Sequence, residues 1–309
     1  MSFRLLYFLV FLLAACQSDP FDNIPDFDSW WDYGDPAGTE LRFRQFLQQD
    51  SLKLPREIRL EVMTQLARTQ GLQGRFDQAH AILDSVAARL PETPSLAHVR
   101  YYLERGRVYN SEGTPELGVI FFLDALGTSL ELGQDFYAID AAHMLGIATP
   151  LNQRLTWNER ALALAETSDE PRARMWVGSL YNNIGWLHFE GENYPAALTM
   201  FRKNMIWQED NGGAEDIRIA RWSMARTLRA EGIPELALEH QQKLEAEIDS
   251  LELEPDGYVF EEIAECLLAM DSTSAAKPYF RRAYIFLSKD PWLQEHEPER
   301  LERLALLGE

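Results

Sequence analysis

The sequence has few of the residues that form catalytic or metal-binding sites. Its 309 residues include two cysteines and six histidines. The histidines show none of the His-x-x-x-His or His-Glu-x-x-His spacings of zinc sites. Gly-x-Gly-x-x-Gly and Gly-x-x-x-x-Gly-Lys phosphate loops and a Gly-x-Ser-x-Gly serine-hydrolase elbow are absent as well. The sequence therefore predicts no metal, no cofactor and no enzymatic activity.

Positive charge is also scarce. The chain has 29 Lys+Arg against 49 Asp+Glu, which gives a formal net charge of −20 at pH 7. Because nucleic acids and anionic membrane surfaces both repel such a chain, neither is expected as a partner. A basic partner and simple solubility are both open explanations of the acidity.

Long apolar runs are absent except at the N-terminus. Arg4 is followed by an uncharged run from Leu5 to Ala15. This pattern is typical of signal peptides and is shorter than the roughly 20 residues that a spanning helix needs. The run ends in Leu13-Ala14-Ala15-Cys16, which resembles the lipobox of bacterial lipoproteins. That resemblance implies removal of residues 1–15 as a signal peptide and lipid attachment to Cys16. The alternative is an ordinary secretory signal followed by a coincidental cysteine.

The implied lipid would tether the protein to a membrane of the cell envelope. Acylation by two or three chains gives stable attachment, because each buried CH₂ contributes about 0.8 kcal/mol. Gln17, rather than Asp, follows Cys16. By resemblance to Gram-negative lipoproteins, this favours the outer membrane over the inner one. With Cys16 acylated, Cys266 has no disulfide partner, so we expect it to be a small buried apolar side chain.

Composition divides the remaining chain into four regions. Residues 16–38 are rich in Asp, Pro and Gly and are predicted to form an acidic tether, in which Trp30, Trp31 and Tyr33 are expected to fold back onto the first helices. Residues 39–58 are predicted to be an N-terminal helical cap, residues 59–290 a helical repeat region, and residues 291–309 a C-terminal cap that shields the last repeat. Because helix formers dominate and no strand-like alternation persists, the predicted fold class is all-α.

Small residues recur at a fixed interval in the repeat region. They are Ala79, Gly118, Ala197, Ala237 and Ala276, at steps of 39, 79, 40 and 39. The double step contains one degenerate unit, in which Leu145-Gly146 precedes the segment from Trp157 to Ala165. The pattern predicts about six units of two helices each, with a period of 39 to 40 residues.

Helix-turn-helix units with small crossing residues and an aromatic residue on the second helix resemble tetratricopeptide repeats (TPRs). The aromatic residues are Phe122, Phe201 and Phe280. The resemblance implies a right-handed superhelical solenoid whose first helices line a concave groove. The sequence departs from the family where the period exceeds the usual 34 residues, Asn204 replaces a late alanine and Gln241 replaces the aromatic residue.

The small residue of each first helix marks which neighbours should face the groove. The predicted groove residues are Arg68, Arg107, Asn110, His143, Asn182, Trp186, Phe189, Trp222, Arg226 and Arg229. Guanidinium groups bind carboxylates bidentately, so an acidic or C-terminal peptide segment would suit this surface. In the alternative interpretation, the arginines pair with neighbouring carboxylates and the two tryptophans pack between helices.

These features favour a non-enzymatic, membrane-anchored scaffold or adaptor that binds a protein or peptide through its groove. An alternative is a structural subunit of a cell-envelope assembly, for outer-membrane biogenesis or secretion, that has no groove ligand. Peptide binding by the isolated body would favour the first function. Co-purification with large membrane proteins would favour the second.

Overall fold

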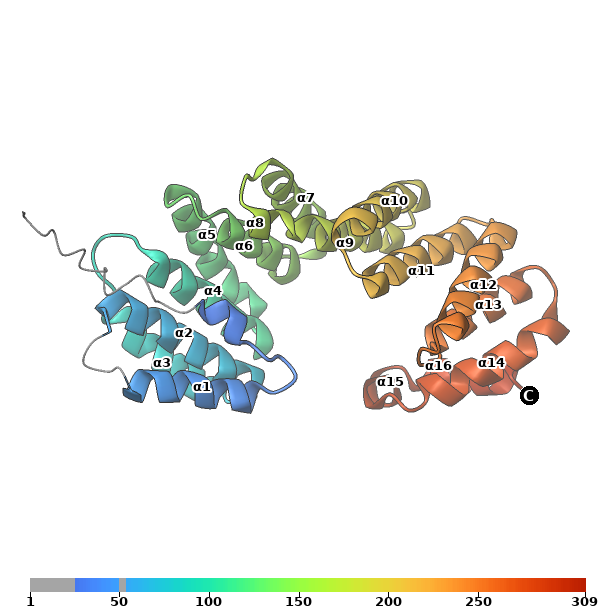
Figure 1. The fold of residues 1–309 in the computed structure, drawn as a ribbon, viewed down its shortest axis with the longest axis horizontal. Helices are drawn as coiled ribbons and strands as arrows, with labels where there is room; N and C mark the ends of the chain where they lie inside the picture. Colours follow the sequence, from blue (N-terminus) through green and yellow to red (C-terminus); the bar gives the residue numbers. More distant parts are fainter. Residues whose placement is uncertain (1–25, 50–53) are drawn as a thin grey trace, which may run out of the picture.

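The computed structural model describes residues 26–49 and 54–309, and these residues form helices without any β-strand (Figure 1). Consecutive helix pairs make up most of them, and the short helix α8 (Pro171–Arg174) separates the third pair from the fourth. The pairs are α2 (Arg56–Leu72) with α3 (Phe76–Ala87), α4 (Leu96–Ser111) with α5 (Pro115–Glu131), α6 (Asp135–Ala148) with α7 (Leu151–Thr167), α9 (Trp176–Glu190) with α10 (Tyr194–Asn211), α11 (Ala214–Ala230) with α12 (Pro234–Ser250), and α13 (Gly257–Ala269) with α14 (Thr273–Leu287). The predicted units are therefore present, including the degenerate third one.

The pairs stack in chain order into an arch. Figure 1 shows α1 to α3 at one end and α13 to α16 at the other, with both ends on the same side of the arch. Each second helix packs against the first helix of the next pair. Ion pairs join the first helices of successive pairs, such as Arg68 on α2 with Glu104 on α4. The first helices thus share one continuous surface, which we call the concave surface.

Small residues on the second helices allow close approach within each pair. All five residues that the repeat pattern identified are buried there. A Cβ atom on Gly118 would lie 2.8 Å from the carbonyl oxygen of Gly106, so the α4 and α5 backbones are in contact. The ring of Phe122 fills the space beside Gly106, where a Cβ atom would come within 2.5 Å of it. Gly185 and Phe201 repeat this arrangement in the fourth pair, at 2.6 Å.

The N-terminal part of the described chain packs against the first pair. It consists of the 3-10 helix η1 (Phe27–Trp30) and helix α1 (Pro36–Gln49). Phe27 is buried with Phe43 of α1 and Val62 of α2. The aromatic side chains of this segment bury an apolar surface on the body, as expected. A helix already begins at Pro36, which lies inside the segment predicted as a tether, residues 16–38. Residues 16–25, with Cys16, lie outside the described residues.

The C-terminal residues cover the last pair. Helices α15 (Pro291–His296) and α16 (Pro298–Leu307) follow α14. Leu301 and Leu304 of α16 pack in one apolar cluster with Phe280 of α14, which shields the end of the stack.

Cys266 on α13 is a fully buried free thiol, as predicted. Across residues 26–49 and 54–309, no helix combines the length and apolarity that crossing a bilayer would require.

Candidate partner-binding surface

All ten predicted groove residues lie on first helices. Arg68 is on α2, Arg107 and Asn110 are on α4, His143 is on α6, Asn182, Trp186 and Phe189 are on α9, and Trp222, Arg226 and Arg229 are on α11. The fold brings Arg68, Arg107 and Asn110 together at one cleft. It brings Trp186, Phe189, Trp222 and Arg226 together at a second place, which we call the aromatic patch.

The aromatic patch is half-buried and spans α9 and α11. The Trp186 and Trp222 ring centroids are 5.9 Å apart, and Phe189 lies 5.2 Å from Trp186. The Arg226 guanidinium stands 5.3 Å from the Trp222 ring centroid and 5.9 Å from that of Trp186. Trp186 also contacts the buried ring of Phe201 at 5.1 Å, so its indole is partly a packing element between helices.

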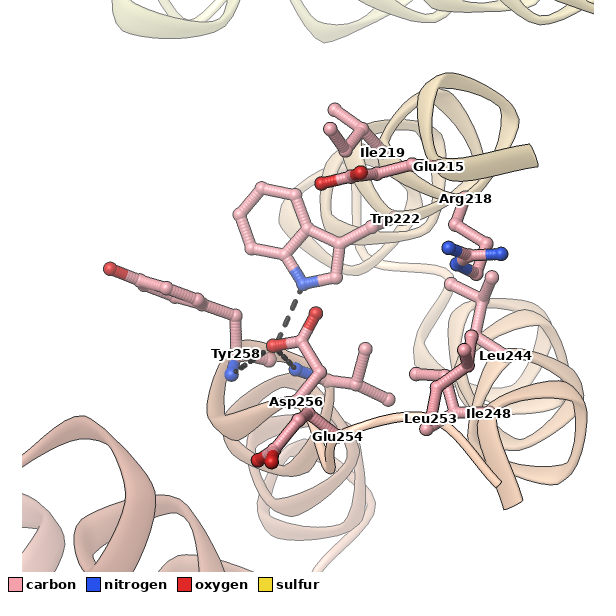
Figure 2. A pocket seen from close by; sticks show the side chains of 11 residues that line it. Glu215, Arg218, Ile219, Trp222, Leu244, Ile248, Leu253, Glu254, Asp256 and Tyr258 are labelled. Atoms are coloured by element: carbon pink, nitrogen blue, oxygen red, sulfur yellow. Dashed lines mark hydrogen bonds between the residues drawn. The ribbon is translucent and has the colours of Figure 1, made fainter. Parts of the chain in front are cut away.

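A pocket of about 610 Å³ opens beside Trp222 (Figure 2). Its walls come from α11, α12, the connection after α12 and the start of α13. The lining side chains are Glu215, Arg218, Ile219, Trp222, Leu244, Ile248, Leu253, Glu254, Asp256, Tyr258 and Val259. The Trp222 Nε1–H donates to the carbonyl oxygen of Tyr258 at 3.3 Å, which fixes the indole as one wall. Trp222 is the one residue of this pocket that sequence reasoning had identified.

Two of the predicted groove arginines, one on the first helix of pair one and one on the first helix of pair two, bond to a carboxylate on the first helix of the next pair. Arg68 Nη1 lies 3.4 Å from Glu104 on α4, and Arg107 Nη2 donates to Asp140 on α6 at 2.6 Å. Arg107 also donates to Glu104 at 2.6 Å. The charges of Asp140 and Glu104 outweigh burial and raise the pKa of Arg107 above its usual value.

The same pairing recurs in the fifth and sixth pairs. Arg229 donates to both carboxylate oxygens of Glu262 on α13, at 2.8 and 2.9 Å, and Arg226 Nη1 lies 3.5 Å from that carboxylate. Glu262 is 1% exposed. The ion pairing that the alternative interpretation predicted is therefore present along the concave surface. Its arginines do not form a row of free cations.

These carboxylates carry a sequence signal that the sequence reasoning did not use. Glu104 follows Arg68 by 36 residues, and Asp140 follows Arg107 by 33. These separations are three to seven residues shorter than the repeat of 39 to 40, which is about one or two helical turns, so the acid lies on the same face of the next first helix.

The two remaining predicted residues pack where the arch turns between α6 and α9. The His143 ring lies 5.1 Å from that of Trp176, and its Nδ1 is 3.5 Å from the Asn183 amide. Burial lowers the pKa of His143, which favours the neutral imidazole. The Asn182 Oδ1 atom is buried and has no hydrogen-bond partner among the described residues.

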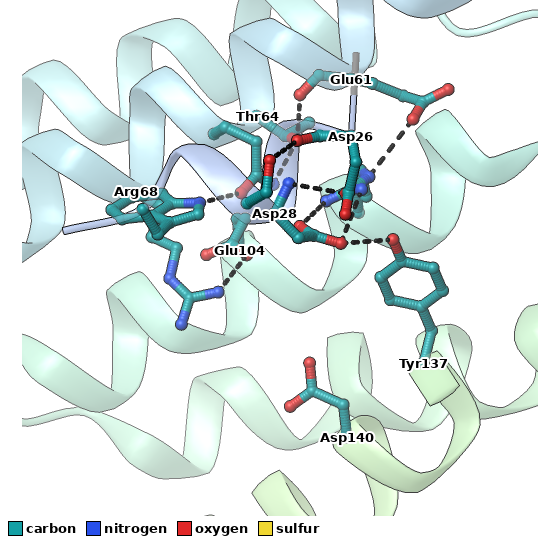
Figure 3. Close-up of polar contacts among 12 residues, drawn as sticks. Asp26, Asp28, Glu61, Thr64, Arg68, Glu104, Tyr137 and Asp140 are labelled. Atoms are coloured by element: carbon teal, nitrogen blue, oxygen red, sulfur yellow. Dashed lines mark hydrogen bonds and ion pairs between the residues drawn. The ribbon is translucent and has the colours of Figure 1, made fainter. Parts of the chain in front are cut away.

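The N-terminal segment inserts an acidic side chain between the first helices (Figure 3). Asp28 accepts hydrogen bonds from Arg100 Nη1 at 2.9 Å and Nη2 at 3.2 Å, from the Tyr137 hydroxyl at 3.1 Å, and from Arg172 Nη2 at 2.6 Å. These donors come from α4, α6 and α8, and we call this constellation the Asp28 site. The adjacent Trp31 donates its Nε1–H to Gln65 at 2.9 Å, which confirms that the aromatic residues fold back onto the first helices.

The Asp28 site holds a charged carboxylate although it is largely buried. Burial alone would raise the pKa of Asp28, but the hydrogen bonds and charges of Arg100 and Arg172 outweigh it and hold that pKa well below its usual range. Glu61 on α2 shows the opposite behaviour. Burial raises its pKa to about 7, although Arg100 Nε lies only 3.3 Å from its carboxylate. The terminal nitrogens of Arg100 point instead at Asp28.

Sequence reasoning missed Arg100, Tyr137 and Arg172. Arg100 precedes the predicted groove residue Arg107 by seven residues, about two turns on the same face of α4. That spacing could have placed Arg100 on the concave surface. No comparable signal was available for Arg172, which lies on the short insertion α8.

Comparison with known proteins supports the fold. No protein-family model matches the chain, and no curated protein sequence matches it. Among solved structures, apo RapI superimposes with a TM-score of 0.70 at 10% identity, over 91% of this chain and 79% of RapI. The apo quorum sensor NprR from B. thuringiensis gives 0.59 at 16% identity, over 91% and 79%. A tetratricopeptide repeat protein from Parabacteroides merdae gives 0.51 at 16% identity, over 91% and 95%.

The chain is a solenoid of tetratricopeptide-like repeats. In this TPR-like solenoid, the concave surface carries two distinct features. The Asp28 site lies in the N-terminal half, and the aromatic patch with its neighbouring pocket lies in the C-terminal half. Across the part of the solenoid that the structure describes, no group of three His, Cys, Asp or Glu side chains is placed to hold a metal ion.

Proposed function

We propose that this TPR-like solenoid is a non-enzymatic scaffold that binds an acidic segment of a protein partner on its concave surface, while a lipid on Cys16 holds it at the cell envelope. The observation that supports binding is the Asp28 site. There, two guanidinium groups and a phenol from three helices hold one carboxylate of the chain's own N-terminal segment. A partner side chain of the same chemistry would meet the same donors.

The donors of the Asp28 site are held in place by their neighbours. The Arg100 guanidinium is stacked 5.0 Å from the Tyr137 ring centroid, and that of Arg172 lies 3.6 Å from the Phe136 ring centroid. Arg100 is only 6% exposed. Groups held in this way lose little conformational freedom when a carboxylate binds, which favours affinity.

A labelled peptide that carries residues 26–33 tests the proposal. Asp28→Asn removes the charge of the chain's own carboxylate, so the variant should bind the peptide more tightly than wild type does. Adding Arg172→Gln should weaken that binding, because one of the three donors is lost. Arg174→Gln is the matched control, since Arg174 lies on the same short helix, is exposed and has no ion pair among the described residues.

Either of two results would contradict binding of acidic segments at the Asp28 site. If Asp28→Asn binds the peptide no better than wild type, or if the two arginine substitutions weaken binding equally, the Asp28 site does not recognise acidic segments. In that case, retention of large envelope proteins by all these variants would favour the assembly-subunit function instead.

We also propose that the anchor places this scaffold in the outer membrane rather than the inner one. The proposal rests on the lipobox-like residues before Cys16 and on Gln17 after it. Cys16→Ser should leave an unprocessed or unanchored protein that is not labelled by radioactive palmitate. Continued labelling of that variant would exclude Cys16 as the lipid site. Separation of inner and outer membranes by density would test the location.

A further inference from the structure

The pocket beside Trp222 lies between the fifth and sixth pairs. Helices α11 and α13 meet there through the hydrogen bond from Trp222 Nε1 to the Tyr258 carbonyl oxygen. The connection from Leu251 to Asp256 carries the chain across the gap and includes Glu252 in the left-handed conformation, with φ 52°. Figure 2 shows the side chains arranged around an open space between the helices and this connection.

The floor of this pocket is apolar. Leu244 and Ile248 of α12 and Val259 of α13 are buried in one cluster, against which Trp222 packs. Ile219 and Leu253 extend the apolar lining outward and are 49% and 39% exposed. A pocket of about 610 Å³ falls within the range of roughly 300–1,000 Å³ that is typical of ligand sites.

The mouth of the pocket carries uncompensated negative charge. Glu215 and Glu254 are exposed lining residues without an ion-pair partner among residues 26–49 and 54–309. The one cation in the lining, Arg218, lies 3.6 Å from Glu247, which also accepts a hydrogen bond from Arg221 at 2.8 Å, so acidic side chains outnumber basic ones in the lining. The third lining carboxylate, Asp256, accepts the backbone N–H of Tyr258 at 2.8 Å and so caps α13.

We propose that this pocket binds a peptide segment in which a large apolar side chain adjoins a lysine or arginine. The apolar side chain enters the floor formed by Leu244, Ile248 and Val259. The adjoining cation lies between Glu215 and Glu254 and meets the face of Trp222, an arrangement that attracts cations. This goes beyond the proposed function, because the pocket shares no residue with the Asp28 site and prefers the opposite charge.

Dansylcadaverine is a suitable first probe, since it joins an apolar fluorophore to a primary ammonium group. Its fluorescence should rise on binding to the full chain. A dansyl amide of 6-aminohexanoic acid, which has a similar apolar body and a carboxylate, should bind more weakly. An acetylated, amidated Lys-Leu-Lys peptide should displace dansylcadaverine, whereas the Glu-Leu-Glu peptide should not.

Paired variants locate the site. The double substitution Glu215→Gln, Glu254→Gln should weaken dansylcadaverine binding by about threefold to tenfold, as expected for two exposed charge interactions. Glu231→Gln, Glu235→Gln is the matched control, because both residues are exposed at the opposite end of α11 and α12. Ile219→Ser should also weaken binding, whereas Ile206→Ser, at a residue of α10 that is 58% exposed, should not.

Each outcome decides the proposal. Equal weakening by the two glutamate pairs would show that the probe responds to overall charge, which would overturn the site. Equal binding of the anionic dansyl compound would overturn the preference for a cation. Probe binding that the Lys-Leu-Lys peptide does not displace would overturn the peptide assignment. All the substituted residues are exposed, so circular dichroism should show unchanged folding.

Discussion

A methyl group added at Gly118 would enter a crossing where two helix backbones already touch. Its Cβ atom would lie 2.8 Å from the Gly106 carbonyl oxygen, whereas ordinary contacts begin at 3.4 Å. The α4 and α5 backbones would therefore have to separate by about 0.6 Å, the difference between these two distances. Overpacking of this kind costs about 1–3 kcal/mol. The higher helix propensity of alanine offsets up to ~1 kcal/mol of that cost.

Gly127 provides a matched control on the same helix. A Cβ atom there would meet no atom within 4 Å, so Gly127→Ala should stabilise α5 by ~0.5–1 kcal/mol through propensity alone. The difference between the two variants then reports the overpacking itself. Because solenoids need not unfold in one step, we would compare urea midpoints from circular dichroism and from tryptophan fluorescence. If the Gly118→Ala variant is as stable as the Gly127→Ala variant, the close crossing is refuted. The larger substitution Gly118→Leu should give a protein less stable than Gly118→Ala does.

Three further predictions concern buried ionisable groups. The lowered pKa of Asp28 implies stability that is present above its unfolded value of about 3.8 and lost as the pH falls below it. Asp28→Asn should therefore flatten the acid side of a urea-midpoint profile. Glu61, with a pKa raised from 4.5 to about 7, contributes stability that is full below pH 4.5 and lost as the pH rises through 7. Glu61→Gln should remove that loss of stability, which is of the order of 3 kcal/mol. If the urea midpoint of the variant changes between pH 5 and 8 as steeply as that of the wild type, the prediction is wrong. Burial raises the pKa of Cys266 to about 12, so iodoacetamide should label its thiol only in denaturant.

The repeat architecture could be predicted because it depends on local and periodic features. Each crossing needs a side chain small enough for two backbones to approach, and that need recurs once per unit. The five small residues on α3, α5, α10, α12 and α14 therefore identified every second helix except α7, whose unit lacks the same marker. The helix phase was also sufficient to place Trp186 and Trp222 on adjacent first helices.

The concave surface was harder to predict, because it depends on which side chains of different units meet. Arg107 was predicted to face the groove, but whether it stays free depends on Asp140, which is 33 residues away in the sequence. The contact of Asp28 with Arg172 spans 144 residues. No periodic signal encodes a contact of that kind.

The sequence by itself thus determined the six helix pairs and their stacking in chain order, since size, polarity and spacing within one unit decide these. It also carries the lipobox-like residues that end at Cys16. Only the tertiary structure decided that Asp28 bonds to Arg100, Tyr137 and Arg172 and that a pocket opens beside Trp222. The physical reason is that ion pairs and cavities arise from the relative positions of several units. The charge and volume of any one residue do not specify those positions.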